Sequence, residues 1–211
     1  NTLKAFFQAH KIDPFRTVHQ SVTRYFKDPH LIQYFDRYPT YNGSSPYLAP
    51  ATLNIISYVE HAFGGYYIQG GLFSLIKRLY EIAIQSGIKI YLNQTVDQIL
   101  YENHKITGIL TDSVKIYADY ILCNQDVVTA YTQLIAGFDR TKSKLTRLEP
   151  SISGLVFFWQ VNRTHEQLLQ HNILFSHDYQ SEFRQIFKEK TAADDPTVYI
   201  AITSKRDSQH A

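Results

Sequence analysis

The residues of this chain that could do chemistry are a glycine pair, two nearby histidines and one cysteine. His165 and His171 superficially resemble a zinc-protease motif, but they stand six residues apart instead of the four that one helix face requires. Cys123 is the only cysteine, so an internal disulfide is excluded. The sequence contains no Gly-x-Gly-x-x-Gly turn, Walker loop or Gly-x-Ser-x-Gly elbow. It therefore predicts no metal site and no activated nucleophile.

The glycine pair Gly70-Gly71 stands at the head of a predicted helix. Gly87 stands where a left-handed cap would end that helix. Two explanations of the pair remain open at this point. It lets the chain bend into the helix, or it lets a ligand approach the backbone closely. The apolar stripe of the helix has the spacing of a single face and comprises Leu72, Leu75, Ile76, Leu79, Ile82 and Ala83.

Composition narrows the classes of function. The 211 residues are 44% hydrophobic and carry a net charge of +2, which gives no electrostatic case for a nucleic-acid partner. No signal peptide or long apolar run is present, so a cytoplasmic protein with at most peripheral membrane contact is expected. Aromatic residues make up 14% of the chain, which indicates either a well-filled core or a wide apolar cavity.

Periodicity predicts an α/β protein in which helices precede and flank short strands. Phe6, Phe7, His10 and Ile12 precede Asp13-Pro14, which favours a helix start there. The expected helices lie within residues 15–63, with a loop at 38–50, and at 72–87, 124–135 and 178–188. The expected strands are 88–92, 96–101, 106–110, 114–116, 120–123, 153–161, 172–175 and 197–203, of which 120–123 reads as a buried central strand.

The order of these features closely resembles the middle of the phytoene (carotenoid) desaturase family of flavoprotein oxidoreductases. The likeness covers nearly the whole chain. Its central part is the series that runs from Gly70-Gly71 through the strands to residues 118–127. The other segments that carry it are 26–31, 42–46, 88–93, 95–99, 105–109, 168–176 and 195–199.

The resemblance implies a two-dinucleotide-binding-domain fold that holds FAD non-covalently, with an α+β substrate domain of mixed or antiparallel sheet above an apolar tunnel. It implies hydride transfer from a C–C bond of a polyene, a carotenoid, to the flavin. On this basis residues 1–63 form a helical region at the membrane side of the substrate domain, residues 64–136 part of the FAD-binding domain, and residues 137–211 the sheet and helices of the substrate domain.

The resemblance also assigns cofactor contacts to particular residues. The backbone of Val96 would meet the adenine, and Gly70-Gly71 would border the cofactor and the substrate. The residues before this pair, Ile68-Gln69, depart from the family's proline-arginine. The run Cys123, Asn124, Gln125 and Asp126 would lie close to the cofactor, although alanine is usual at Gln125.

Four aromatic residues on predicted strands are candidates for lining the polyene slot. They are Phe157, Trp159, Phe175 and Tyr199, and ordinary core packing is the alternative for each. No carboxylate stands out as a proton acceptor, so no catalytic residue is predicted.

The family also has a glycine-rich βαβ unit before this region and a flavin-binding segment after it. With no methionine in the sequence, this predicts that the 211 residues are a central portion that binds FAD weakly or not at all on its own. Two alternatives remain. One is a retinol-saturase-like or amine-oxidase-like flavoprotein, and the other is a stand-alone module that binds an apolar ligand.

Overall fold

The computed structural model describes residues 13–208, which divide into two compact units. Of the described residues, 13–77 and 151–208 belong to the first unit, and Arg78–Pro150 form the second. Both contain helices and antiparallel strands, so the expectation of a mixed α and β protein is confirmed at this level. The predicted apolar positions Phe6, Phe7, His10 and Ile12 lie outside the described residues.

Side-chain caps fix the first helices of the first unit. Thr17 and Gln20 form a capping box at the start of α2, and the Asp28 carboxylate accepts hydrogen bonds from the first amides of α3. The first helix among the described residues therefore begins at Val18, not at the predicted Asp13-Pro14. The helices are α2 (Val18–Tyr25), α3 (Pro29–Asp36), the 3₁₀ helices η2 (Tyr38–Asn42) and η3 (Ala51–Asn54), and α4 (Ile55–Phe63).

A small core holds α2, α3 and the following loop together. Val18 and Val22 of α2 are buried against Ala49 of the loop. Phe26 and Phe35 stack with ring centroids 4.7 Å apart, which joins α2 to α3. The Val18 amide also donates to the Ala49 carbonyl at 3.0 Å. The loop predicted at 38–50 is therefore partly helical, and its end at Ala49 is part of the core.

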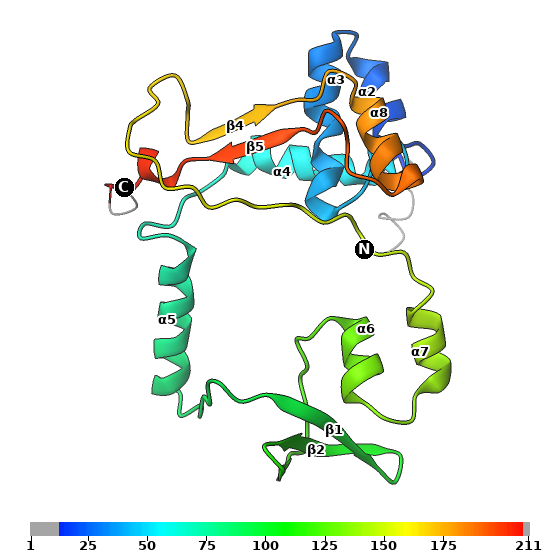
Figure 1. The fold of residues 1–211 in the computed structure, drawn as a ribbon, viewed down its shortest axis with the longest axis vertical. Coiled ribbons are helices and arrows are strands. Elements are labelled where there is room, and N and C mark those ends of the chain that lie inside the picture. The colour runs from blue at the N-terminus through cyan, green and yellow to red at the C-terminus, as the bar shows by residue number, and fades with distance from the viewer. Residues whose placement is uncertain (1–12, 209–211) are drawn as a thin grey trace, which may run out of the picture. The chain divides into compact units, whose positions relative to one another are not determined.

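The last part of the chain adds a two-stranded antiparallel ribbon and a helix to the first unit (Figure 1). Phe183 of α8 contacts Tyr47 with ring centroids 6.0 Å apart, and Gln33 of α3 donates to the Ser176 carbonyl at 2.8 Å. The elements are β4 (His171–Leu174), α8 (Tyr179–Arg184), the π-helical turn η5 (Gln185–Glu189), β5 (Val198–Ala201) and the 3₁₀ helix η6 (Thr203–Lys205). The helix at 178–188 and the strands near 172–175 and 197–203 are thus confirmed.

Helix α5 (Leu72–Gln85) has the predicted cap but not the predicted burial. Gly87 adopts φ +80°, and the Ile88 amide donates to the Ala83 carbonyl at 3.0 Å, as in a left-handed C-cap. No residue of α5 is buried, and Leu79 is 57% exposed.

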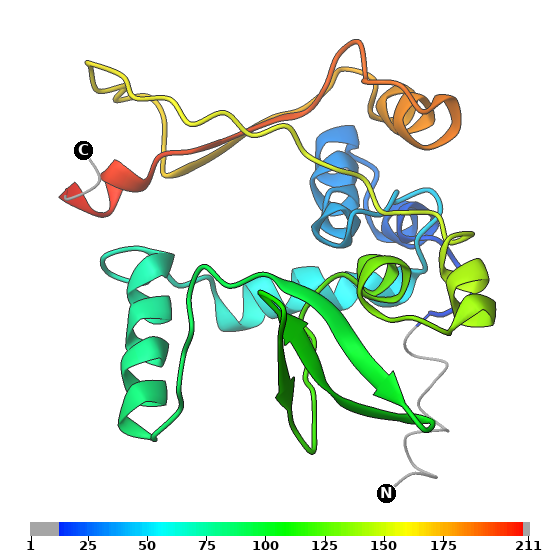
Figure 2. The ribbon, with the colours of Figure 1, turned by 60° about the horizontal axis from the view of Figure 1, so that its bottom comes forward.

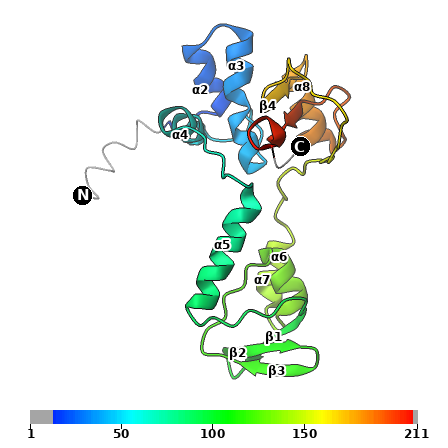
Figure 3. The same ribbon diagram turned by 90° about the vertical axis from the view of Figure 1, so that its left-hand side faces the viewer.

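The second unit is built on the predicted three-stranded meander, which is confirmed (Figure 2). Its two turns, Asn103-His104 and Asp112-Ser113, have positive φ at both residues, as tight hairpins require. Ile135 makes a parallel bridge to Ile99, which ties the helical part of this unit to the sheet. The elements are β1 (Val96–Glu102), β2 (Lys105–Thr111), β3 (Val114–Tyr117), α6 (Val127–Thr129), the π-helical turn η4 (Ala130–Leu134) and α7 (Asp139–Leu145) (Figure 3).

Three predicted strands are not strands in the structure: 88–92, 120–123 and 153–161. Their apolar patterns are suited to a sheet, but a strand forms only where a neighbour completes the hydrogen-bond ladder. Within residues 13–208 no segment pairs with them. The prediction that 120–123 is a buried central strand is also wrong for this structure, since Tyr120 and Leu122 are almost fully exposed.

Candidate functional site

Val96 stands at the first position of β1, where the strand is irregular. It pairs with Thr111 of β2, and the register shifts between Val96 and Gln98. The Thr111 hydroxyl donates to the Thr95 carbonyl at 2.7 Å, which anchors the entry to β1. Such irregularities re-aim backbone groups at the edge of a sheet. The structure thus places Val96 at a half-exposed sheet edge whose backbone departs from the regular ladder.

The predicted cofactor loop Cys123, Asn124, Gln125 and Asp126 is exposed and lies directly before α6. Asp126 has a structural role, because its Oδ1 atom accepts a hydrogen bond from the Thr129 amide at 3.0 Å and caps the helix. This hydrogen bond from Thr129 is the largest cause that lowers the pKa of Asp126. The structure brings this loop and Val96 into one unit and places the glycine pair in the other.

Gly70 and Gly71 both adopt φ +79°, a conformation that glycine tolerates best. The Gly70 amide donates to Asp207 Oδ2 at 2.8 Å, and the Gly71 amide donates to the Ile68 carbonyl at 2.8 Å. A Cβ atom on Gly70 would lie 2.5 Å from the Ser74 hydroxyl. Both amides are therefore engaged within the chain, as the bend into α5 requires, and a cofactor contact of the pair stays a prediction.

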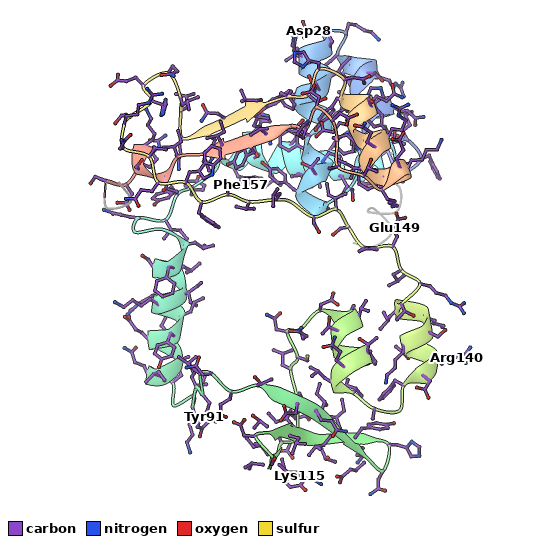
Figure 4. All side chains as sticks on the ribbon, in the orientation of Figure 1. Asp28, Tyr91, Lys115, Arg140, Glu149 and Phe157 are labelled. Atoms are coloured by element: carbon purple, nitrogen blue, oxygen red, sulfur yellow. The ribbon has the colours of Figure 1, made fainter. Side chains whose placement is uncertain are left out.

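The four predicted substrate residues do not gather in one pocket. Phe157, labelled in Figure 4, is 66% exposed. It contacts Trp159, which is 80% exposed, with ring centroids 5.9 Å apart. Phe175 packs edge-on against Tyr179, and Tyr199 of β5 stacks on His171 of β4. They form three separate aromatic contacts within the first unit.

A pocket of about 440 Å³ in the first unit contains none of these four residues. It lies between the loop that follows η2 and the helical segment α8–η5. Tyr47, Phe183 and Phe187 contribute its aromatic wall, and Asp178, Arg184 and Lys188 contribute charge. An open pocket with so many charged groups is a poor fit for a long hydrocarbon.

Sequence reasoning missed a cluster of five residues around an arginine, which we call the Arg37 cluster: Tyr34, Arg37, Tyr38, Tyr41 and Glu60. The Arg37 guanidinium lies 5.1, 4.4 and 5.7 Å from the ring centroids of the three tyrosines. Spacings of three and four residues along α3 and η2 place these rings around it. That spacing was the available signal, but Glu60 arrives from α4 and no local pattern reveals it.

Glu60 receives donors on both carboxylate oxygens. Its Oε1 atom accepts from Arg37 Nη2 at 3.1 Å and from the Tyr38 hydroxyl at 2.8 Å, and its Oε2 atom accepts from the Tyr41 hydroxyl at 3.1 Å. Burial alone would raise the pKa of Glu60, but the hydrogen bonds from Tyr38 and Tyr41, with the Arg37 charge, lower it. The carboxylate is therefore held in its ionised form.

A second buried pair joins α2 to α3. His19 Nδ1 and Asp36 Oδ2 lie 2.6 Å apart, and the Asp36 side chain is 1% exposed. Its other oxygen, Oδ1, has no hydrogen-bond partner among residues 13–208. Burial raises the pKa of Asp36, and the hydrogen bond and charge of His19 oppose this shift.

The described residues contain neither a metal site nor a membrane-spanning helix. No group of three or more His, Cys, Asp or Glu side chains has an arrangement that could hold a metal ion. No helix in the part of the chain described here has the length and apolar character to cross a bilayer.

Comparison with known proteins decides the family. Residues 7–187 match the family model of flavin-containing amine oxidoreductases. The chain belongs to this family. Within it, the chain is 41% identical over 210 residues to the 1-hydroxycarotenoid 3,4-desaturase of Flavobacterium sp. strain P99-3, an alignment that covers 100% of this chain and 43% of the relative.

Two further relatives of this flavin-containing oxidoreductase are named as oxygenases. The chain is 32% identical to the 4,4'-diapolycopene oxygenase of Methylomonas sp. and 34% identical to the 4,4'-diaponeurosporene oxygenase of Staphylococcus haemolyticus. These alignments cover 94% and 95% of this chain and 40% of each relative. The resemblance to the carotenoid desaturases is confirmed, and the chain spans less than half the length of these relatives.

Proposed function

We propose that the complete protein containing this chain is an FAD-dependent desaturase of a carotenoid-like polyene. The observation that carries the proposal is the 41% identity to a named 1-hydroxycarotenoid desaturase, which extends over all of this chain. The match to a family of flavin-containing oxidoreductases supplies the redox chemistry. When bound, FAD would accept a hydride from one carbon of a C–C single bond, while a proton leaves the neighbouring carbon and the bond becomes double.

The residues present fit the edges of a flavin nucleotide, not its phosphates. The exposed backbone at Asn124 and Gln125 and the irregular ladder at Val96 can meet the flat groups of the cofactor. The amides of Gly70 and Gly71 are already engaged, and the sequence lacks a glycine-rich phosphate turn. We therefore expect this chain alone to bind FAD weakly, and tight stoichiometric binding in a fluorescence titration would contradict that assignment.

The apolar surfaces of the chain suit a polyene and the rest of a larger fold. The segment 153–161 carries Phe157, Phe158 and Trp159, all exposed, and the apolar stripe of α5 is exposed as well. Burial of such area is favourable by roughly 25 cal/mol per Å². We infer that other parts of the complete protein cover α5 and that Phe157 and Trp159 exclude water from the polyene.

The finer architecture is part of the same proposal. We assign residues 64–136 to the FAD-binding domain of a two-dinucleotide-binding-domain fold, and residues 1–63 and 137–211 to a substrate domain. The family match and the meander at 96–117 support this assignment. In it, segments 88–92 and 120–123 become strands once the neighbouring strands of the complete protein are present.

We further propose a peripheral membrane contact for the complete, cytoplasmic protein. Helix α4 has no buried residue, and Ile55, Tyr58, Val59 and Phe63 are exposed on it. Apolar and aromatic side chains of this kind insert at the headgroup boundary. In a liposome flotation assay, Ile55→Ser with Val59→Ser should release the complete protein from vesicles, and undiminished flotation would contradict this contact.

The desaturase proposal is tested by product analysis. The complete protein, expressed in cells that accumulate an acyclic polyene or its 1-hydroxylated form, should yield a product lighter by two hydrogen atoms. The identity to the two named oxygenases favours a second candidate function, oxygenation of a polyene end, and this would give a product heavier by oxygen. Recovery of unchanged polyene would contradict both.

A further inference from the structure

We propose that the Arg37 cluster binds the oxygen-bearing end of the polyene and so selects a hydroxylated substrate over the corresponding hydrocarbon. This inference rests on the proposed desaturase function and adds a specificity site to it. The cluster matches both parts of a hydroxyl-bearing polyene. Its aromatic rings can cover the hydrocarbon chain, and its charged pair can receive the hydroxyl.

The polar atoms of the cluster converge from three elements of the first unit. Arg37 directly follows α3, Tyr41 belongs to η2, and Glu60 belongs to α4. Arg37 Nη1 donates to the Tyr41 hydroxyl at 3.0 Å, and that hydroxyl donates to Glu60 Oε2 at 3.1 Å. A ligand hydroxyl beside Tyr41 could donate to the carboxylate and accept from the guanidinium, as the tyrosine hydroxyl does.

The exposed fraction of the side chains in the Arg37 cluster rises from Tyr38, at its buried base, to Tyr41, at its accessible rim. Tyr38 is fully buried, and the side chains of Arg37 and Glu60 are 14% and 36% exposed. Tyr41 is 59% exposed, so its hydroxyl and Glu60 Oε2 form the accessible side. The buried base orients the charged groups in advance, which lowers the entropic cost of binding a ligand there.

The guanidinium has one donor that the fold does not use. Arg37 Nε is buried and has no hydrogen-bond partner among the described residues. An unsatisfied buried donor is destabilising, so an arginine placed here for stability alone is a poor solution. The planar, always-charged guanidinium is instead suited to hold an oxygen atom in a defined direction.

Tyr199, a predicted substrate residue in the same unit, interacts electrostatically with the cluster. Burial raises the pKa of Tyr199, and Tyr41 is the next largest cause. Tyr199 therefore lies within electrostatic reach of the accessible rim. Its own hydroxyl is hydrogen-bonded to His171, on which its ring stacks.

A polar cluster is needed for this selectivity, because a purely apolar pocket discriminates poorly between a hydroxylated polyene and the corresponding hydrocarbon. A hydrophobic pocket distinguishes only weakly between a ligand with a hydroxyl and the same ligand without it. A site built to hydrogen-bond a hydroxyl disfavours the analogue that lacks it much more strongly. The alternative role for Arg37 and Glu60 is to brace α3 and η2 against α4. A brace would support every substrate equally, and the two roles therefore differ in their effect on paired substrates.

The test uses the complete protein with FAD, and two acyclic polyenes that differ only in a terminal hydroxyl. Glu60→Gln removes the charge that would receive the ligand hydroxyl and keeps the shape of the side chain. We expect it to lower kcat/KM for the hydroxylated polyene about tenfold, the loss for one hydrogen bond to a charged group. The value for the hydrocarbon should stay within about twofold. Glu189→Gln, an exposed carboxylate outside the cluster, should change neither value.

The outcomes separate the inference from the proposed function. An equal fall for both polyenes, or no fall for either, would overturn the specificity site while leaving the desaturase intact. An unmutated protein that converts neither polyene would instead refute the proposed function. Arg37→Lys provides a second readout, since it keeps the charge but loses the planar geometry, and it should raise KM for the hydroxylated polyene more than it lowers kcat.

Discussion

Helices α2 and α5 both carry an apolar stripe, but the stripe is buried in α2 and exposed in α5. Helix α2 buries Val18, Ser21 and Val22 against a loop that its own N-terminus holds by hydrogen bonds. Helix α5 is almost twice as long and buries no residue. The comparison teaches that amphipathic spacing specifies a face and does not specify which segment covers it. The stripe of α2 is covered within this chain, whereas the stripe of α5 is left uncovered by the described residues.

The largest expected contrast comes from placing the same charge on the two stripes. Val18→Asp should lower the free energy of unfolding of the chain by at least about 3 kcal/mol, because it buries an unpaired carboxylate. Leu79→Asp in α5 should change it by less than about 0.5 kcal/mol, since the side chain remains in water. Urea unfolding monitored by circular dichroism measures both.

The same two substitutions can be compared in the complete protein. If α5 is covered there, Leu79→Asp becomes severely destabilising and approaches the effect of Val18→Asp. An unchanged stability in the complete protein would mean that α5 remains exposed, and the inferred role of its stripe would be wrong.

The entry to α5 can be tested through its glycine. Gly70→Ala should cost about 1–2 kcal/mol, because an L-residue is disfavoured at φ +79° and the new methyl group would meet Ser74. Gly154→Ala is the matched control, since a Cβ atom there meets nothing within 4 Å. Thermal unfolding of both variants gives the difference, and equal effects would remove the conformational explanation of the glycine pair.

The packed region should depend on its caps. Asp28→Ala removes the acceptor for the amides of His30 and Leu31 at the start of α3 and should cost about 1 kcal/mol. Asp28→Asn keeps an acceptor at this position and should retain most of the stability. A loss of the same size in both variants would point to the charge instead of the cap.

The smallest expected effect is a change in the pH dependence of stability. Asp36 has a pKa raised by burial, so the folded state binds its proton more tightly than the unfolded state. The stability that Asp36 contributes is fully present below its pKa in the unfolded state, and it is lost as the pH rises through its pKa in the folded state. Asp36→Asn should therefore flatten the stability profile over the acidic range above the unfolded pKa, measured by urea unfolding. A profile identical to that of the unmutated chain would contradict the assignment, and Tyr47→Phe, beside His19, is a matched control.

Local chemistry made much of the fold predictable. The turns at Asn103-His104 and Asp112-Ser113 and the cap at Gly87 follow from residues that tolerate positive φ, and the sequence shows them directly. The segments 88–92, 120–123 and 153–161 were misjudged because no segment among residues 13–208 pairs with them. A periodic pattern carries no information about whether such a neighbour is present.

The candidate site was less predictable for the same physical reason. The resemblance supplied Val96 and the loop at Asn124, and their roles stay predictions. It supplied nothing about Arg37 and Glu60, which are 23 residues apart in sequence and meet only because α3 and α4 pack together. The Asp207 carboxylate on the Gly70 amide, 137 residues away, was equally invisible to local patterns.

The most direct test of the account is anaerobic mixing of the FAD-loaded complete protein with a 1-hydroxylated acyclic polyene. The account predicts that the flavin absorbance bleaches as a product with one additional double bond forms, in equal amounts. A flavin that stays oxidised while the polyene is bound and recovered unchanged would contradict it.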